Sequence, residues 1–177
     1  QVIPPEEEAC YSEKVVYLPD TYQVNDSKRR IAAHTPTRAE AGLPDRGFVF
    51  CCFNNTFKIT PDIFDVWMRL LNNVSGSVLW LFEENAAVPR NLGREAGARG
   101  VASERLVFAK MVKLDDHLAR LKLADLFLDT LPYTAHTTGS IALWAGLPVL
   151  TCQGTTFPAR VGASLLHAVG LPELIAH

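Results

Sequence analysis

The sequence has 177 residues and a net charge of −2, and 48% of its residues are hydrophobic. This length suffices for one domain with a substantial core, and the near-neutral charge gives no indication of a nucleic-acid or membrane-surface partner. No apolar run approaches the roughly 20 residues of a membrane-spanning helix, and the first residues show no secretory signal pattern. We therefore expect a cytoplasmic chain without nucleic-acid or membrane partners.

The cysteines favour a reducing compartment and give no metal signature. Cys51 and Cys52 lie inside an apolar run, and no Cys-x-x-Cys pair occurs in the sequence. Thiols in such a run usually pack as small hydrophobic groups. This pattern agrees with the cytoplasm and argues against a zinc site.

Residues 1–46 differ in character from the rest of the chain. Val15-Val16-Tyr17-Leu18 predicts one short strand that ends at Pro19, and the following residues show little periodicity. Lys28-Arg29-Arg30 is more typical of a solvated face than of a phosphate clamp. The segment therefore resembles the end of one unit followed by a connector.

From residue 47 onward, apolar runs alternate with helical patterns. Strands are predicted at 48–53, 77–82, 106–109, 124–128 and 148–152. Between and after them, helices are predicted from Thr60, over 88–98, from Asp115, after Thr138 and over 160–169. This alternation indicates βαβ units and an α/β fold, a Rossmann-like parallel sheet with helices on both faces.

In such sheets, ligands bind just after the carboxyl ends of the strands. Lys58 follows the first strand, so it is a candidate phosphate partner, with an ordinary surface lysine as the alternative. His117 and Arg120 follow the third strand, three residues apart on one helix face. Their planar groups could stack on or bond to a base, unless they only form a solvated face.

The fourth strand leads to His136-Thr137-Thr138-Gly139 at the start of a helix. Thr137 or Thr138 is expected to cap that helix, whose first N–H groups and positive dipole end suit an anion. The alternative is a cap that binds nothing. Because three loops supply polar candidates, we expect them to converge on one rim.

Two common nucleotide signatures are missing from the sequence. No Gly-x-Gly-x-x-Gly follows the first strand, and no P-loop occurs. Helix N-termini together with Lys and Arg instead suit a nucleotide-diphosphate sugar as ligand. Such groups can stabilise the negative charge of the departing diphosphate without a metal.

The same stretches resemble a known family. Phe53-Asn54-Asn55-Thr56-Phe57-Lys58-Ile59, His136-Thr137-Thr138-Gly139 and Leu143-Trp144-Ala145-Gly146-Leu147-Pro148-Val149 carry the likeness, with shorter matches at Tyr11-Ser12-Glu13, Val78-Leu79-Trp80-Leu81 and Leu128-Asp129-Thr130. They are similar to the C-terminal, donor-binding half of the catalytic region of O-linked N-acetylglucosamine transferases, in their bacterial branch.

The resemblance implies a GT-B glycosyltransferase fold, usually behind tetratricopeptide repeats. It implies transfer of N-acetylglucosamine from UDP-GlcNAc to protein Ser or Thr hydroxyls, without metal or other cofactor. Residues 1–46 would then be the end of the N-terminal catalytic lobe and a connector, and 47–177 a truncated nucleotide-sugar lobe. The implied donor-binding residues are Asn55, Lys58, His117, Arg120, His136, Thr137, Thr138 and Gly139, with Lys58 at the phosphate and His117 and Arg120 at uracil.

Three residues depart from the family pattern. Asn55 stands in place of a common Gln, Leu114 in place of a Lys of animal members, and Ile141 in place of an Asp that reaches the ribose. Isoleucine cannot accept a hydrogen bond, so the resemblance predicts weak UDP binding with little preference for ribose over 2′-deoxyribose.

The family's proposed catalytic histidine belongs to the N-terminal lobe, so no catalytic residue is assigned in this chain and the fragment alone is expected to be inactive. Two alternatives stay open. One is a cytoplasmic N-glycosyltransferase that uses UDP-glucose, and the other is a degenerate module that keeps the fold without catalysis.

Overall fold

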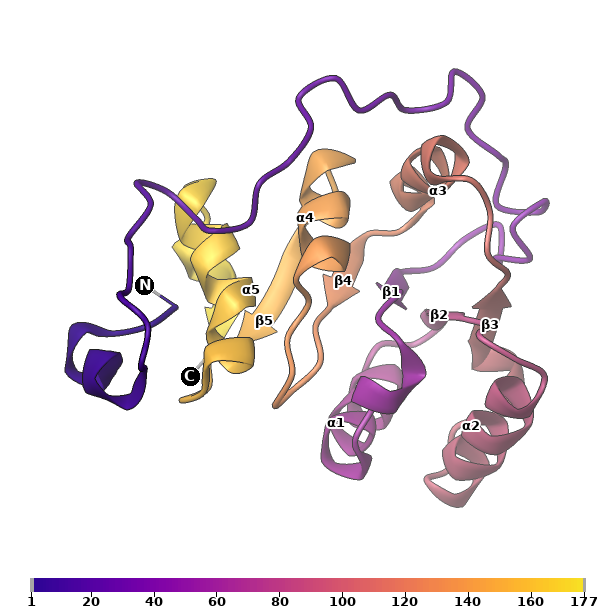
Figure 1. The fold of residues 1–177 in the computed structure, drawn as a ribbon. Helices are drawn as coiled ribbons and strands as arrows, with labels where there is room; N and C mark the ends of the chain where they lie inside the picture. The colour runs from indigo at the N-terminus through magenta and orange to yellow at the C-terminus, as the bar shows by residue number, and fades with distance from the viewer. Residues whose placement is uncertain (1, 177) are drawn as a thin grey trace.

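Six parallel strands form the centre of the computed structural model, which describes residues 2–176 (Figure 1). The strands lie in the order β3-β2-β1-β4-β5-β6. Their bounds are β1 Val49–Cys52, β2 Val78–Phe82, β3 Leu106–Ala109, β4 Leu126–Leu128, β5 Val149–Cys152 and β6 Ile175–Ala176. The five strands predicted from residue 47 onward are confirmed, and β6 is a short addition at one edge.

The predicted helices are also confirmed, with shifts at their ends. Their bounds are α1 Pro61–Asn73, α2 Ala87–Ala98, α3 Leu114–Arg120, α4 Thr137–Trp144 and α5 Phe157–Ala168. The Thr60 hydroxyl accepts a hydrogen bond from the Ile63 N–H at 3.4 Å, the predicted cap of α1. Helix α5 begins three residues before the predicted start, because Pro158 suits a first helical turn.

The strand order creates a reversal point between β1 and β4. The chain starts at β1 in the middle of the sheet, moves outward to β2 and β3, and returns through α3 to β4 on the other side. Helices α1 and α2 lie on one side of the sheet, and α3 and α4 lie on the other (Figure 1). At such a reversal the two flanking loops diverge and leave a crevice beyond the strand ends.

The core lies on both sides of the central strands. Trp67, Trp80 and Phe127 are the largest fully buried side chains, and every residue of β1 is buried. Cys51 and Cys52 are buried as predicted, and burial raises the pKa of both thiols. Their packing therefore matches that of small hydrophobic residues.

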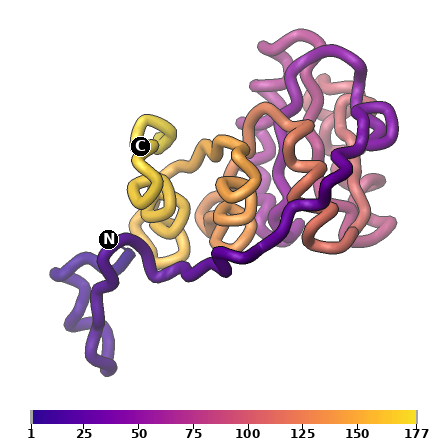
Figure 2. Tube along the Cα trace, turned by 90° about the horizontal axis from the view of Figure 1, so that it is seen from above, coloured from indigo at the N-terminus to yellow at the C-terminus, as the bar shows by residue number. Residues whose placement is uncertain are grey.

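The N-terminal segment is an irregular strap that crosses the helices. After a 3₁₀ turn at Pro5–Cys10, it runs past α5 and α4 to α3 (Figures 1 and 2). Asn25 accepts a hydrogen bond from the Ser140 hydroxyl at 2.6 Å, and the Ala32 N–H donates to the carbonyl of Asp115 at 3.1 Å. The strap therefore attaches to α4 and α3.

The strand predicted at residues 15–18 is wrong. These residues have no strand hydrogen bonds, and the Val16 side chain is 74% exposed. A strand needs a neighbouring sheet edge, whereas this segment lies beside helix α5. No helix within residues 2–176 is long and apolar enough to cross a membrane.

Candidate functional site

A pocket of about 290 Å³ opens beyond the carboxyl end of β1. Segments that follow β1 and β3 meet there with the last residue of β2 and with helices α3 and α4. The lining residues are Phe53, Asn55, Phe82, Met111, Val112, Leu114, His117, Arg120, Thr138 and Ile141. Four of the predicted binding residues, from the segments after β1, β3 and β4, thus line one pocket, whereas Lys58 and His136 are not among its lining residues.

Arg120 forms one wall of this pocket and is largely buried. Its guanidinium lies 5.0 Å from the centroid of the Phe53 ring and 5.9 Å from that of Trp80. Its Nη1 donates to the carbonyl of Lys110 at 2.8 Å, which ties the β3–α3 loop to α3. The alternative of a solvated face is therefore excluded for Arg120, because its charge is held between aromatic rings and a carbonyl.

His117 takes a defined tautomer from its neighbour. The Nε–H of Arg120 donates to Nδ1 of His117 at 3.0 Å. A guanidinium has only donors, so Nδ1 is the acceptor and the proton of the neutral ring is on Nε2. Burial, with a smaller effect from the Arg120 charge, lowers the pKa of His117 from 6.5 to about 4. The pocket therefore contains a neutral imidazole with one N–H to donate.

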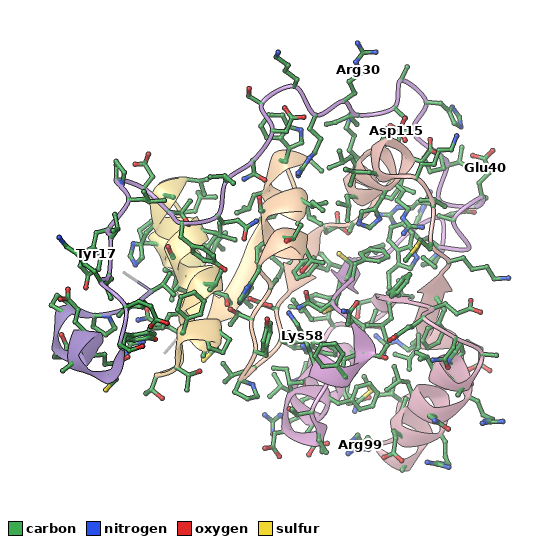
Figure 3. All side chains as sticks on the ribbon, viewed as in Figure 1. Tyr17, Arg30, Glu40, Lys58, Arg99 and Asp115 are labelled. Carbon is green, nitrogen blue, oxygen red and sulfur yellow. The ribbon has the colours of Figure 1, made fainter. Side chains whose placement is uncertain are left out.

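Lys58 lies at the same edge of the sheet, outside the residues that line the pocket. It comes from a short 3₁₀ turn, Thr56–Lys58, and its Nζ donates to the carbonyl of Thr134 at 3.0 Å. The ammonium also lies 3.8 Å from the centroid of the Tyr133 ring. Lys58 thus points toward the loop between β4 and α4 (Figure 3). Burial lowers its pKa, although the charge of Asp129 opposes this shift.

His136 lies outside the pocket, and both of its ring nitrogens face partners within the chain. Nε2 is 3.5 Å from the carbonyl of Pro158, which can only accept, and Nδ1 is 3.1 Å from the hydroxyl of Tyr22 in the strap. The ring stacks on Tyr133 at a centroid distance of 4.9 Å. Burial lowers the pKa of His136. The structure therefore places His136 as a contact between the strap and the β4–α4 loop.

The expected threonine cap of α4 is wrong. The cap position belongs to His136, and no side chain caps this helix. Thr137 is exposed, whereas the Thr138 hydroxyl instead donates to Oδ1 of Asn54. Gly139 is buried, and a Cβ there would lie 3.2 Å from that of Ala135. Gly139 thus allows close packing beside the loop.

Asp129 and Asn54 form a buried polar cluster that sequence reasoning missed. Oδ1 of Asp129 accepts from the N–H groups of Thr130 at 2.7 Å and Ala135 at 2.6 Å. It also accepts from Nδ2 of Asn54 at 3.2 Å, while Oδ2 accepts from the Thr151 hydroxyl at 2.7 Å. Burial raises the pKa of Asp129, and these hydrogen bonds oppose the shift. Asp129 directly follows β4 and Asn54 is the second residue after β1, and this position at a strand end is the signal that could have identified them.

Within residues 2–176, no group of three or more His, Cys, Asp or Glu side chains is arranged to hold a metal ion. The polar groups at the site are instead a lysine, a buried arginine, a neutral histidine, hydroxyls and amides. Such groups can hold a planar base and a phosphate through hydrogen bonds and charge.

Comparison with known proteins identifies the family. The model of glycosyl transferase family 41 matches residues 30–177. A probable UDP-N-acetylglucosamine--peptide N-acetylglucosaminyltransferase SEC of Arabidopsis thaliana is 39% identical over 166 residues, or 91% of this chain and 17% of that protein. The corresponding transferase of Caenorhabditis elegans is 39% identical over 140 residues, or 79% of this chain and 12% of that protein.

A solved structure agrees with these relatives. A mutant of the Thermobaculum terrenum O-GlcNAc transferase superposes with a TM-score of 0.85 at 32% identity, over 99% of this chain and 33% of that one. The chain thus spans a third or less of these proteins. The match confirms both the predicted resemblance and the predicted fold class, a Rossmann-like lobe of a GT-B glycosyltransferase. The chain belongs to glycosyl transferase family 41.

Proposed function

We propose that this chain is the donor-binding lobe of a glycosyltransferase that moves N-acetylglucosamine from UDP-GlcNAc to Ser or Thr hydroxyls of a protein. The observation that carries this proposal is the pocket at the reversal point, where Asn55, His117, Arg120 and Thr138 meet. Relatives named for this transfer support it. Residues 1–46 would form the end of the preceding lobe and a connector.

The pocket walls suit a nucleoside base. Phe53, Met111 and Val112 provide apolar contact for a flat ring, and the Nε2–H of His117 is available to a base carbonyl. Because the guanidinium of Arg120 already packs against Phe53, its role is to orient His117 and to keep the pocket positively charged. A pyrimidine with its ring carbonyls fits this combination.

The diphosphate would lie between the pocket and Lys58. The start of α4, with Thr137, Thr138 and Gly139, offers backbone N–H groups, and Lys58 supplies a positive charge at the same edge of the sheet. This arrangement would neutralise a departing diphosphate without a metal ion. Asn55 and His136 complete the proposed set, with His136 acting through the loop and not through direct contact.

We infer that the chain alone does not transfer sugar. The residues described here provide donor contacts, and an acceptor-side base would come from a preceding lobe, accompanied by tetratricopeptide repeats as in the wider family. The buried thiols of Cys51 and Cys52 suit a reducing cytoplasm.

Calorimetry and a turnover assay test the proposal together. The chain should bind UDP more tightly than uridine, and more tightly than ADP or GDP. Pure protein incubated with UDP-GlcNAc and an acceptor peptide should release no UDP above background. Failure to bind any uridine nucleotide would instead favour the degenerate module, which the apolar Ile141 in the pocket wall also favours.

A further inference from the structure

The hydrogen bonds behind the pocket wall run in one direction and end at Thr138. They begin at Asp129, whose Oδ1 accepts from the N–H groups of Thr130 and Ala135. A backbone N–H can only donate, so this oxygen is an acceptor toward all of its neighbours. The side-chain nitrogen of Asn54, at 3.2 Å, therefore donates to it.

A second contact fixes the orientation of the Asn54 amide independently. Its Nδ2 also lies 2.8 Å from the hydroxyl of Thr130, and that hydroxyl gives its only proton to the carbonyl of Tyr133 at 2.7 Å. The Thr130 oxygen must therefore accept from Asn54. With Nδ2 held by two acceptors, Oδ1 of Asn54 faces Thr138.

These contacts fix the direction in which the Thr138 hydroxyl donates its proton. Asn54 is 1% exposed, so its Oδ1 needs a donor inside the protein, and the hydroxyl of Thr138 is the partner that supplies it. A hydroxyl has one proton and two lone pairs. Once the proton is directed to Asn54, the hydroxyl of Thr138 has only lone pairs left for a ligand, and Thr138 is one of the residues that line the pocket.

We propose that Thr138 determines specificity by accepting a hydrogen bond from a hydroxyl of the nucleotide's ribose, rather than by donating one to a phosphate. Thr138 and Ile141 are three residues apart on α4, and both line the pocket. Thr138 thus provides the ribose acceptor that the apolar Ile141 cannot provide. This inference rests on the proposed function, because it takes the ligand to be a uridine nucleotide.

The test compares Thr138→Val with Thr138→Ser, using UDP, uridine and the 2′-deoxy and 3′-deoxy analogues of UDP in calorimetry. The valine variant should bind UDP and uridine more weakly by the same factor of about ten, which is the usual effect of losing one hydrogen bond. It should leave unchanged the affinity for the analogue that lacks the bonded hydroxyl, and serine should restore binding. Thermal melts would show that both variants are folded.

Two results would overturn the inference. If valine weakens UDP but leaves uridine unaffected, the hydroxyl serves the phosphate. If valine changes the affinity of none of the ligands, Thr138 makes no ligand contact through its side chain.

Neutron diffraction of the unaltered chain in D₂O gives an answer that needs no ligand. The deuteron of Thr138 should point to Oδ1 of Asn54, and a deuteron that points into the pocket would refute the inference. A chain with the expected deuteron but no affinity for UDP would contradict the proposed function and leave the direction of the hydrogen bonds supported.

Discussion

The Nε–H of Arg120 donates to Nδ1 of His117 across one turn of α3 at 3.0 Å, and this contact makes Nδ1 the acceptor of the imidazole at the wall of the pocket. Burial and the adjacent positive charge lower the pKa of His117 from 6.5 to about 4. Between these two pH values an unfolded chain binds a proton at His117 that the folded chain does not bind. Stability therefore decreases as the pH falls through this window.

The contribution of His117 should appear in a comparison with His117→Asn. Asparagine does not titrate, yet its side-chain oxygen can still accept from Arg120. As the pH falls from 6.5 to 4, the original chain should lose up to about 3 kcal/mol more unfolding free energy than the variant. Urea titrations across this range measure the difference. Parallel stability curves for the two proteins would show that His117 is not responsible.

Arg120→Lys should weaken the binding of uridine and of UDP by the same amount, about 1–2 kcal/mol. The planar guanidinium donates to His117 and to the carbonyl of Lys110 while its face lies on Phe53. A lysine keeps the charge, but its ammonium has no flat face and cannot make these three contacts together. Calorimetry with both ligands is the measurement. Full affinity in the lysine variant would mean that Arg120 supplies only charge.

Lys58→Met should discriminate between the same two ligands. Methionine keeps much of the length of the aliphatic side chain and removes the ammonium that lies over Tyr133. UDP binding should weaken by about 1.5–3 kcal/mol, because a charge-assisted contact to phosphate is lost, whereas uridine binding should change little. An equal loss for uridine would mean that Lys58 acts through its hydrogen bond to the Thr134 carbonyl.

Gly162 supports the Asp129 cluster from α5, and a larger residue should disturb it. A Cβ at this position would lie 2.6 Å from the Thr151 hydroxyl and 2.7 Å from Oδ2 of Asp129. Gly162→Ala should therefore reduce the unfolding free energy by about 1–3 kcal/mol and also weaken UDP binding.

The matched control for this substitution is Gly93→Ala in α2. A Cβ there would meet only Ser103, at an ordinary contact distance of 3.6 Å. Because alanine is favoured over glycine inside a helix, this variant should be more stable by about 0.5–1 kcal/mol. Denaturant titration compares the two, and equal effects would show that the cluster tolerates the extra methyl group.

The sheet was predictable because each buried strand is a short apolar run between turn residues, as at 48–53 and 77–82. The irregular strap was not predictable, because residues 15–18 have a strand-like composition. Only the fold shows that no sheet edge lies beside them. The position of Asn54 after a strand is visible in the sequence. The direction of the hydrogen bonds of Asn54 is not visible in the sequence. It depends on Thr130 and Asp129, which are 75 residues or more away along the chain.

Ile141→Asp tests whether the pocket can gain a second ribose acceptor. Residue 141 faces the pocket one turn along α4 from Thr138, so a carboxylate there and the lone pairs of Thr138 could each accept from one ribose hydroxyl. In the unaltered chain the second hydroxyl would lie against an apolar side chain, at a cost of about 1–3 kcal/mol. The aspartate should therefore tighten the binding of UDP and increase the preference for UDP over 2′-deoxy-UDP in calorimetry.

The control variant Ile141→Asn keeps an acceptor without the charge. An improvement with asparagine alone would therefore reveal repulsion between the carboxylate and the diphosphate. If neither variant changes the preference for ribose, residue 141 does not contact the ribose.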